Sequence, residues 1–225
     1  MKRVAVLASG AGSNLEAILD YLASLRSTAP CSVVVVASDR PQAGAIEKAR
    51  ARQIEAVVLH EASNPESPEL GALLASKQID LVALAGYLKL VPAAVVDAYA
   101  SRIVNVHPSL LPAFGGPGMY GLRVHQGVIN AHEKISGVTV HYVTHEYDRG
   151  PMLAQWPVAV LPTDDAEQLA ARVLVVEHAL YPRVLAALAR GRGDRFPVKP
   201  DVKYYANPPI SADGLAGEID ALLAG

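Results

Sequence analysis

The chain has 225 residues, of which 51% are hydrophobic and 19% charged, and its formal net charge is −2. A composition this apolar excludes a disordered chain, and the small net charge excludes a general electrostatic attraction to nucleic acid, so we expect a small-molecule partner. The lone Cys31, the early start of the first predicted strand and the lack of any apolar run of about 18 residues indicate a cytoplasmic protein without a membrane-spanning helix.

Short apolar runs rich in β-branched residues alternate with helical patterns in the first half of the chain. They predict strands at 3–9, 31–38, 56–60, 79–86 and 102–107, separated by helices at about 13–25, 43–53, 68–77 and 92–100. Strands that are apolar throughout are typical of parallel sheets that are covered by helices. We therefore predict an α/β fold with a mostly parallel, doubly wound (Rossmann-like) sheet and helices on both faces.

The pattern changes after Leu111, where a Gly/Pro-rich loop, PAFGGPGMYG, follows. Two alternating segments, SGVTVHYV at 136–143 and MLAQWPVAV at 152–160, predict strands that are added to the same sheet. A long helix is expected from about 164 to 190. The length fits one large domain over residues 1–190, and the Pro and Gly residues of 191–225 predict a C-terminal surface extension.

A Gly-rich turn, ASGAGSNLEAI, joins the first predicted strand to the first helix, at the sheet edge where ligands of parallel sheets bind. Its glycines let the backbone approach a ligand closely, and the free N–H groups of the helix favour an anion. The predicted phosphate site comprises Gly10, Ala11, Gly12, Ser13 and Asn14. An ordinary tight turn would have the same pattern. A leucine in the third glycine position disfavours a dinucleotide site, and the lack of GK[ST] excludes a P-loop.

A second candidate segment, NVHPSLLP, follows the fifth predicted strand. Side chains alternate along an extended chain, so Asn105 and His107 lie on the same side and would face one ligand beyond the strand end. Their N–H groups can together stabilise an oxygen that becomes negative as a carbonyl carbon turns tetrahedral, which suits acyl transfer. A capping asparagine and a core histidine are the structural alternatives.

The third segment, SGVTVHYVTHEYDRGP, runs from the sixth predicted strand into a polar loop. Alternation places Thr139, His141 and Val143 on one face, and the loop then brings Asp148 to the strand end. Metal binding by His141 and His145 is disfavoured, because four extended residues span about 13 Å. Asp148 can take part in proton transfer or can simply shape its turn.

At these separations, SGAGSN, NVHPSLLP and GVTVHYV with its following aspartate resemble the phosphoribosylglycinamide formyltransferase family, folate-dependent enzymes of purine synthesis. The resemblance extends to about residue 190. The segment NVHPSLLP alone is similar to a broader set of enzymes, which includes methionyl-tRNA formyltransferase and formyltetrahydrofolate deformylase. Each of those two enzymes has an additional domain, and a chain of 225 residues that starts on the first strand leaves no space for it. We therefore expect the phosphoribosylglycinamide formyltransferase family.

The resemblance implies transfer of the formyl group of 10-formyltetrahydrofolate, a co-substrate, to the amine of glycinamide ribonucleotide, without a metal. It implies that Asn105 and His107 hold the oxyanion, and that Asp148 orients His107 and a water that relays the proton. It also maps the phosphate contacts onto residues 12–14 and the contact with the ribose hydroxyls onto Glu177. Without the resemblance, Glu177 would be interpreted as a solvated carboxylate on a helix.

The resemblance further implies a folate pocket with two walls, an apolar slot with backbone hydrogen bonds that suits a flat heterocycle. The implied folate-binding residues are Leu88, Lys89, Val91, Val143, Thr144, His145 and Tyr147, with Thr139 and His141 in support. Lys89 keeps a positive charge for the glutamate tail but lacks the bidentate fork of the arginine found in many relatives. Two alternatives stay open: an enzyme that delivers the formyl group to water or another amine, and a non-catalytic nucleotide-binding module.

Overall fold

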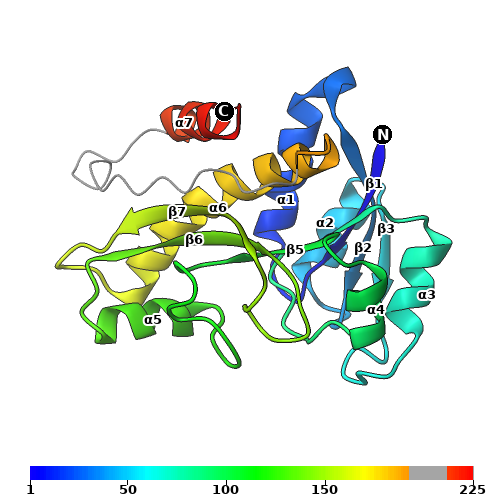
Figure 1. Ribbon diagram of the computed structural model, residues 1–225, viewed down its shortest axis with the longest axis horizontal. Coiled ribbons are helices and arrows are strands. Elements are labelled where there is room, and N and C mark those ends of the chain that lie inside the picture. The colour runs from blue at the N-terminus through cyan, green and yellow to red at the C-terminus, as the bar shows by residue number, and fades with distance from the viewer. Residues whose placement is uncertain (193–211, 225) are drawn as a thin grey trace.

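The computed structural model describes residues 1–192 and 212–224, and its centre is one seven-stranded sheet (Figure 1). The strand order is β3-β2-β1-β4-β5-β6-β7; β1 to β5 are parallel, whereas β6 and β7 are antiparallel to their neighbours. The strands are β1 (Lys2–Leu7), β2 (Cys31–Ser38), β3 (Glu55–Val58), β4 (Leu81–Leu84), β5 (Ile103–His107), β6 (Ile135–Tyr142) and β7 (Met152–Ala159). The predicted α/β class, with strands added after β5, is confirmed.

Helices cover both faces of the sheet, as predicted, and each face has its own hydrophobic core. One core packs α1 and α6 against the sheet, and the other packs α3 and α4. The helices are α1 (Ser13–Ser24), the 3₁₀ turn η1 (Arg26–Thr28), α2 (Gly44–Ala51), α3 (Glu69–Ser76), α4 (Ala93–Ala98), α5 (Leu122–Asn130), α6 (Ala166–Ala189) and α7 (Ala212–Ala224). The sequence of β1 is apolar from Val4 to Leu7 because both of its faces are buried: Val4 and Val6 face the first core, and Ala5 and Leu7 face the second.

Two helices were not predicted from the sequence. Helix α5 directly follows the Gly/Pro-rich loop and contains Gly127, which hides its helical period. Helix α7 lies in the predicted C-terminal extension and packs on α6, with Leu215, Ile219 and Leu223 buried. Residues 193–211 of that extension lie outside the described residues.

Helix α6 packs on the sheet and is fixed to strands β4 and β5 by a buried tyrosine. It begins at a capping box, in which the Asp165 carboxylate accepts from the Gln168 N–H at 2.8 Å. Further along, the hydroxyl group of the fully buried Tyr181 lies 3.0 Å from both the Leu84 carbonyl oxygen, at the carboxyl end of β4, and the Val104 carbonyl oxygen, within β5. This contact sets the position of the helix against the strands that carry the candidate site.

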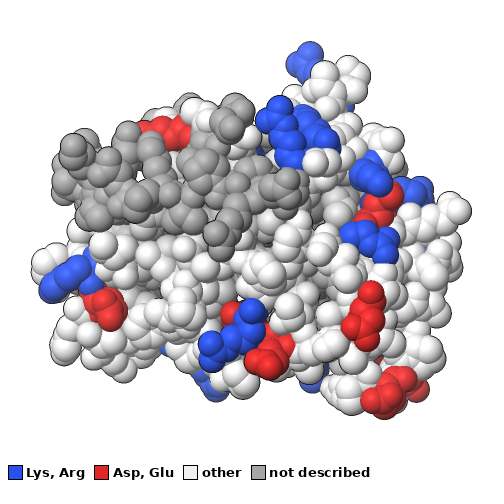
Figure 2. Space-filling model, viewed as in Figure 1, with Lys and Arg blue, Asp and Glu red and all other residues white. Residues whose placement is uncertain are grey.

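Basic and acidic side chains are interspersed over the part of the surface that Figure 2 shows in blue and red. Surface ion pairs account for some of this mixing, such as Lys77 with Glu55 at 2.5 Å and Arg52 with Asp20 at 2.7 Å. Among the described residues, no helix combines the length and the apolar character needed to cross a membrane.

We predict that Tyr181→Phe lowers the free energy of unfolding by about 1–2 kcal/mol, because it removes a buried donor from two strand carbonyls. Urea unfolding measures this change. Tyr120→Phe is the matched control: Tyr120 is 43% exposed, so the same substitution there should change stability by less than about 0.5 kcal/mol. Equal stability of Tyr181→Phe and the wild type would show that the contact contributes nothing.

Candidate functional site

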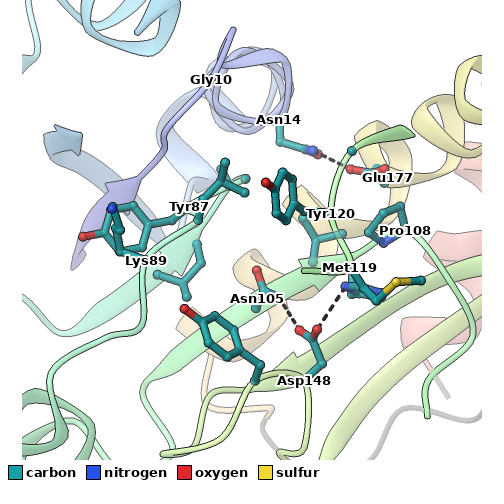
Figure 3. Close-up of a pocket in the computed structure, with 18 of the residues that line it drawn as sticks. Gly10, Asn14, Tyr87, Lys89, Asn105, Pro108, Met119, Tyr120, Asp148 and Glu177 are labelled. Atoms are coloured by element: carbon teal, nitrogen blue, oxygen red, sulfur yellow. Dashed lines mark hydrogen bonds and ion pairs between the residues drawn. The ribbon is translucent and has the colours of Figure 1, made fainter. Parts of the chain in front are cut away.

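A cavity of about 580 Å³ opens at the carboxyl ends of β1, β4 and β5 (Figure 3). The strand order reverses between β1 and β4, so the cavity lies at the topological switch point of the sheet. Five segments line it: residues 10–14, 84–91, 105–108, 116–122 and 143–148, the last without 145. Helix α6 contributes Ala170, Ala171, Leu174 and Glu177, and His125 and His141 complete the lining. The cavity therefore brings together the three segments that the sequence singled out.

The Gly-rich turn forms one end of this cavity. Gly12 is the N-cap of α1, with φ of 76° and no side-chain capping bond, so the first N–H groups of the helix stay available to a ligand. A Cβ on Gly12 would lie 2.7 Å from the Ala45 Cα of α2, whereas a Cβ on Gly10 would meet nothing within 4 Å. Packing against α2 thus requires glycine at 12, while Gly10 lines the cavity and has room for a side chain.

Asn14 and Glu177 form a buried polar pair at the same end of the cavity. The Asn14 amide donates to Glu177 Oε2 at 2.6 Å, and the glutamate is only 9% exposed. Burial raises the pKa of Glu177 to about 7, although the Asn14 hydrogen bond acts in the opposite direction. Asn14 Oδ1 is buried and has no hydrogen-bond partner among the described residues. The pair therefore offers acceptors to a ligand that carries hydroxyl groups.

Asp148 lies at the centre of the polar cluster, as Figure 3 shows. Its Oδ2 accepts from the Gly116 N–H at 2.9 Å and lies 3.5 Å from His107 Nδ1, while Oδ1 lies 3.5 Å from Asn105 Nδ2 and from His141 Nε2. Burial acts to raise the pKa of Asp148, but His141, His107 and the Gly116 N–H outweigh it, and the pKa is lowered. The carboxylate is therefore ionised in a site where it is only 10% exposed.

Asp148 also has φ of 54°, the left-handed conformation that aspartate and asparagine tolerate best. The turn-forming role considered for it from the sequence is thus compatible with its place in the cluster. A single residue serves the backbone turn and presents its carboxylate to the cavity.

The backbone carbonyl of Phe114 determines which nitrogen of His107 is free. His107 Nε2 lies 2.9 Å from the Phe114 oxygen, which can only accept, so Nε2 carries a proton and donates. Nδ1, facing Asp148, is then protonated only in the cationic ring. Burial lowers the pKa of His107 below its ordinary value, and the nearby carboxylate of Asp148 partly offsets this effect.

His141 orients the Asn105 amide. Its Nδ1 lies 2.8 Å from the Tyr142 carbonyl oxygen and must donate to it, which leaves Nε2 of the neutral ring as an acceptor. Asn105 Nδ2 donates to that Nε2 at 3.1 Å. The second amide N–H of Asn105 has only the 3.5 Å contact with Asp148, so it remains available to an oxygen in the cavity.

A second part of the cavity lining is more apolar. Leu88, Lys89 and Val91 line it on one side, and Val143, Thr144 and Tyr147 line it on the other. The Leu88 N–H donates to Ser9 Oγ at 2.9 Å, which attaches this wall to the Gly-rich turn. The residues that the resemblance assigned to a folate therefore converge on one slot, with one exception.

The exception is His145, which does not line the cavity. Its Nε2 lies 2.9 Å from Asp97 Oδ1 of α4, and its side chain is 56% exposed. Strand β6 ends at Tyr142, so His145 lies in a loop, where the alternation of side chains along a strand does not apply. Thr139 also lies outside the lining: its hydroxyl donates to the Ser109 oxygen at 2.7 Å and accepts from the Leu111 N–H at 3.0 Å, which supports the segment after His107.

Several lining residues were missed by the sequence analysis. The loop at 116–122 was noticed only for its composition, and the alanines and leucine of α6 carry no chemical signal. His125 follows that loop; burial, with a further contribution from nearby His107, lowers its pKa to about 4, so its ring is neutral. Within residues 1–192 and 212–224, no three or more histidine, cysteine or acidic side chains gather as a metal site would require.

The chain matches the family model described as formyl transferase over residues 2–185. It is 42% identical to a chloroplastic phosphoribosylglycinamide formyltransferase of Arabidopsis thaliana over 85% of this chain and 66% of that protein, slightly less than two thirds of the relative's length. With a phosphoribosylglycinamide formyltransferase of Bacillus subtilis it shares 37% identity over 87% of this chain and all of that protein. A crystal structure of glycinamide ribonucleotide transformylase 1 from Symbiobacterium toebii superimposes with a TM-score of 0.77 at 40% identity, covering 85% and 89% of the two chains.

We predict that Gly10→Val weakens binding of a phosphate-bearing ligand without changing stability, because Gly10 lines the cavity and a Cβ there meets no protein atom within 4 Å. Gly12→Ala should instead lower stability, because its Cβ meets α2 and its φ is positive. Thermal unfolding combined with calorimetric titration of ribose 5-phosphate separates the two effects. Undiminished binding by a folded Gly10→Val variant would move the phosphate elsewhere.

We predict that Glu177→Gln stabilises the protein at pH 8. The raised folded-state pKa means that the contribution of Glu177 to stability is fully present below its ordinary pKa of 4.5 and is lost as pH rises through about 7. The neutral glutamine avoids this loss, so the variant should gain up to about 3 kcal/mol at pH 8 and less toward pH 5. Urea unfolding at both pH values measures the gain; a variant less stable than the wild type at pH 8 would contradict the prediction.

Proposed function

Because this chain belongs to the formyl transferase family, as one of its phosphoribosylglycinamide formyltransferases, we propose that it transfers the formyl group of 10-formyltetrahydrofolate to the amine of glycinamide ribonucleotide. The reaction is a step of de novo purine biosynthesis. One observation carries the proposal: a single cavity joins an anion-binding helix end, a slot for a flat heterocycle and, between them, the cluster of Asn105, His107 and Asp148.

In this proposal the nucleotide occupies the end of the cavity formed by residues 10–14. Its phosphate accepts hydrogen bonds from the free N–H groups at the start of α1, where the helix dipole favours negative charge. Its ribose hydroxyls donate to Glu177, which lies beside the orphan Asn14 oxygen. The glycinamide amine then points toward Asp148.

The folate occupies the opposite end, with its ring system between the walls that contain Leu88 and Val143. Lys89 lies in the lining and supplies a positive charge for the glutamate tail, though without the bidentate geometry of an arginine. This arrangement brings the formyl group to the polar cluster, between the two ligands.

The proposed chemistry uses the cluster as an oxyanion site. The amine nitrogen attacks the formyl carbon, a C–N bond forms, and the carbonyl oxygen becomes negative; the available N–H of Asn105 and Nδ1–H of protonated His107 donate to it. Asp148 stabilises the protonated imidazole and, through a water, accepts the proton that leaves the amine. A proton is returned to folate N10 as its bond to carbon breaks, so the proton balance closes.

The contact with Phe114 gives this mechanism a requirement that the sequence did not show. Since His107 Nε2 is occupied by the Phe114 carbonyl, a neutral His107 has no N–H left for the oxyanion. Asp148 lies 3.5 Å from Nδ1 and acts against the effect of burial, which lowers the pKa of His107, so we propose that His107 becomes a donor as the charged partner of Asp148.

The alternatives are separated by an assay with and without the amine substrate. Formyl transfer that depends on glycinamide ribonucleotide supports the proposal, whereas equal folate release in its absence would indicate a hydrolase. Binding of the nucleotide with no formyl transfer at all would favour a non-catalytic module. We also propose a cytoplasmic location, since the lone Cys31 is a free, buried thiol that suits a reducing compartment, although the plant relatives are named chloroplastic.

We predict that His107→Ala and Asn105→Ala each lower turnover by at least about a hundredfold, the usual effect of losing one oxyanion donor, while nucleotide affinity stays near normal. Steady-state turnover and calorimetry measure the two quantities. His145→Ala is the control, because its side chain pairs with Asp97 outside the cavity and its loss should leave turnover close to wild type. Normal turnover of His107→Ala would show that this histidine is only a core residue.

We predict that Asp148→Asn folds and binds both substrates but loses on the order of 10² to 10⁴ in the rate of formyl transfer. Asparagine tolerates the same backbone turn, so only the charge that pairs with His107 is removed. Single-turnover measurements across pH give the rate of the chemical step. A wild-type rate with an unchanged pH profile would leave Asp148 a turn residue.

A further inference from the structure

Tyr120 is a large, exposed aromatic side chain that lines the cavity, and the mechanism above assigns it no role. It is 43% exposed, and no described residue hydrogen-bonds its hydroxyl group. In Figure 3 its ring extends into the cavity, and it lies between Asn14 and Asn105 in that view. A ring that stays exposed at the mouth of a ligand cavity has apolar surface to offer to a ligand.

Tyr120 lies two residues before α5, next to its N-cap Gly121. Helix α5 packs on α6, the helix that contributes Ala170, Leu174 and Glu177 to the cavity lining. Tyr147 also lines the cavity, and its hydroxyl contacts the backbone of Leu90 in the apolar wall. Two exposed tyrosines thus line one cavity.

Two glycines beside Tyr120 border open space. Gly118 and Gly121 have φ of 83° and 56°, and a Cβ on either would meet nothing within 4 Å. Arg123 is what holds the ring: its guanidinium stacks on Tyr120 at 5.0 Å, and its N–H donates to the Tyr120 carbonyl. No carboxylate pairs with Arg123 in the part of the chain that the structure describes.

The phosphate end of the cavity lacks a cation of its own. The turn ASGAGSN contains no lysine or arginine, and the nearby Lys48 is paired with Glu16. A phosphate dianion at the start of α1 would meet only the partial charge of the helix end, about half an elementary charge. Arg123 is not part of the cavity lining, but its guanidinium stacks on Tyr120, which does line the cavity, so it brings a positive charge without a carboxylate partner among the described residues.

We propose that Tyr120, held by Arg123, is a nucleotide-contact residue that distinguishes the phosphoribosyl substrate from the folate; the inference rests on the proposed function. The ring packs against the sugar and closes the nucleotide end, and Arg123 attracts the phosphate. The contact is made by the ring face, so phenylalanine can replace tyrosine whereas alanine cannot.

The test is a calorimetric comparison of four variants, with glycinamide ribonucleotide and tetrahydrofolate as separate probes. Tyr120→Ala should bind the nucleotide about tenfold more weakly, as expected for a lost aromatic contact, and tetrahydrofolate as the wild type does. Tyr120→Phe should retain nucleotide affinity. Tyr147→Ala, the matched control, should show the reverse selectivity, and Arg123→Gln should lose nucleotide affinity at low salt but less at high salt.

Unchanged nucleotide affinity of a folded Tyr120→Ala variant would overturn the inference, and so would equal losses for both probes. If Arg123→Gln keeps full nucleotide affinity at low salt, Arg123 has no role in nucleotide binding. A wild-type protein that binds neither probe would overturn the proposed function itself. If the wild type binds both probes and Tyr120→Ala binds them with the same affinities, only the inference about Tyr120 is overturned.

Discussion

The ionised carboxylate of Asp148, nearly enclosed by protein, is the constraint on which the candidate site depends. A buried charge is costly unless other groups compensate it, and here the Asn105 amide, the His107 imidazole and the Gly116 N–H lie beside the two oxygens, while His141 orients the Asn105 amide. These groups come from β5, β6 and the loop that contains Gly116. Satisfying one carboxylate therefore fixes three separate segments against each other, and it does so where the two proposed ligands would meet.

Helix α6 likewise joins separate segments, through two buried polar contacts that lie one helical turn apart. Glu177 lines the cavity and accepts a hydrogen bond from Asn14, while the Tyr181 hydroxyl donates to carbonyl oxygens of β4 and β5. The residues in contact are far apart in the chain, 163 positions in the case of Asn14 and Glu177. The position of the glutamate relative to the Gly-rich turn is thus set by a rigid helix that is itself anchored to the strands.

Much of this arrangement could be predicted from the sequence, because it follows from local periodicity. The apolar strands, the glycine turn and the alternation that pairs Asn105 with His107 depend only on short-range backbone geometry. His145 was proposed only through the family resemblance, and its side chain turns to Asp97 in a loop after β6, where alternation gives no direction. Glu177 was found only through the family resemblance, and the Phe114 and Tyr120 contacts belong to a loop whose path depends on packing with distant elements. Helix α7 was missed because its sequence follows a Pro- and Gly-rich stretch that suggested an irregular extension.

The close approach of Gly12 to Ala45 has a consequence for how the protein can change over evolutionary time. Since a Cβ at position 12 would lie 2.7 Å from the Ala45 backbone, any side chain there forces α2 away from the Gly-rich turn. Such a displacement of α2 also moves the Ala45 N–H, which donates to the Gly10 carbonyl oxygen. The outer edge of the proposed anion site would therefore move as well. Residues 12 and 45 are therefore expected to change together in evolution. A lineage that replaces Gly12 must first shift α2, a neighbouring helix that lies outside the cavity lining.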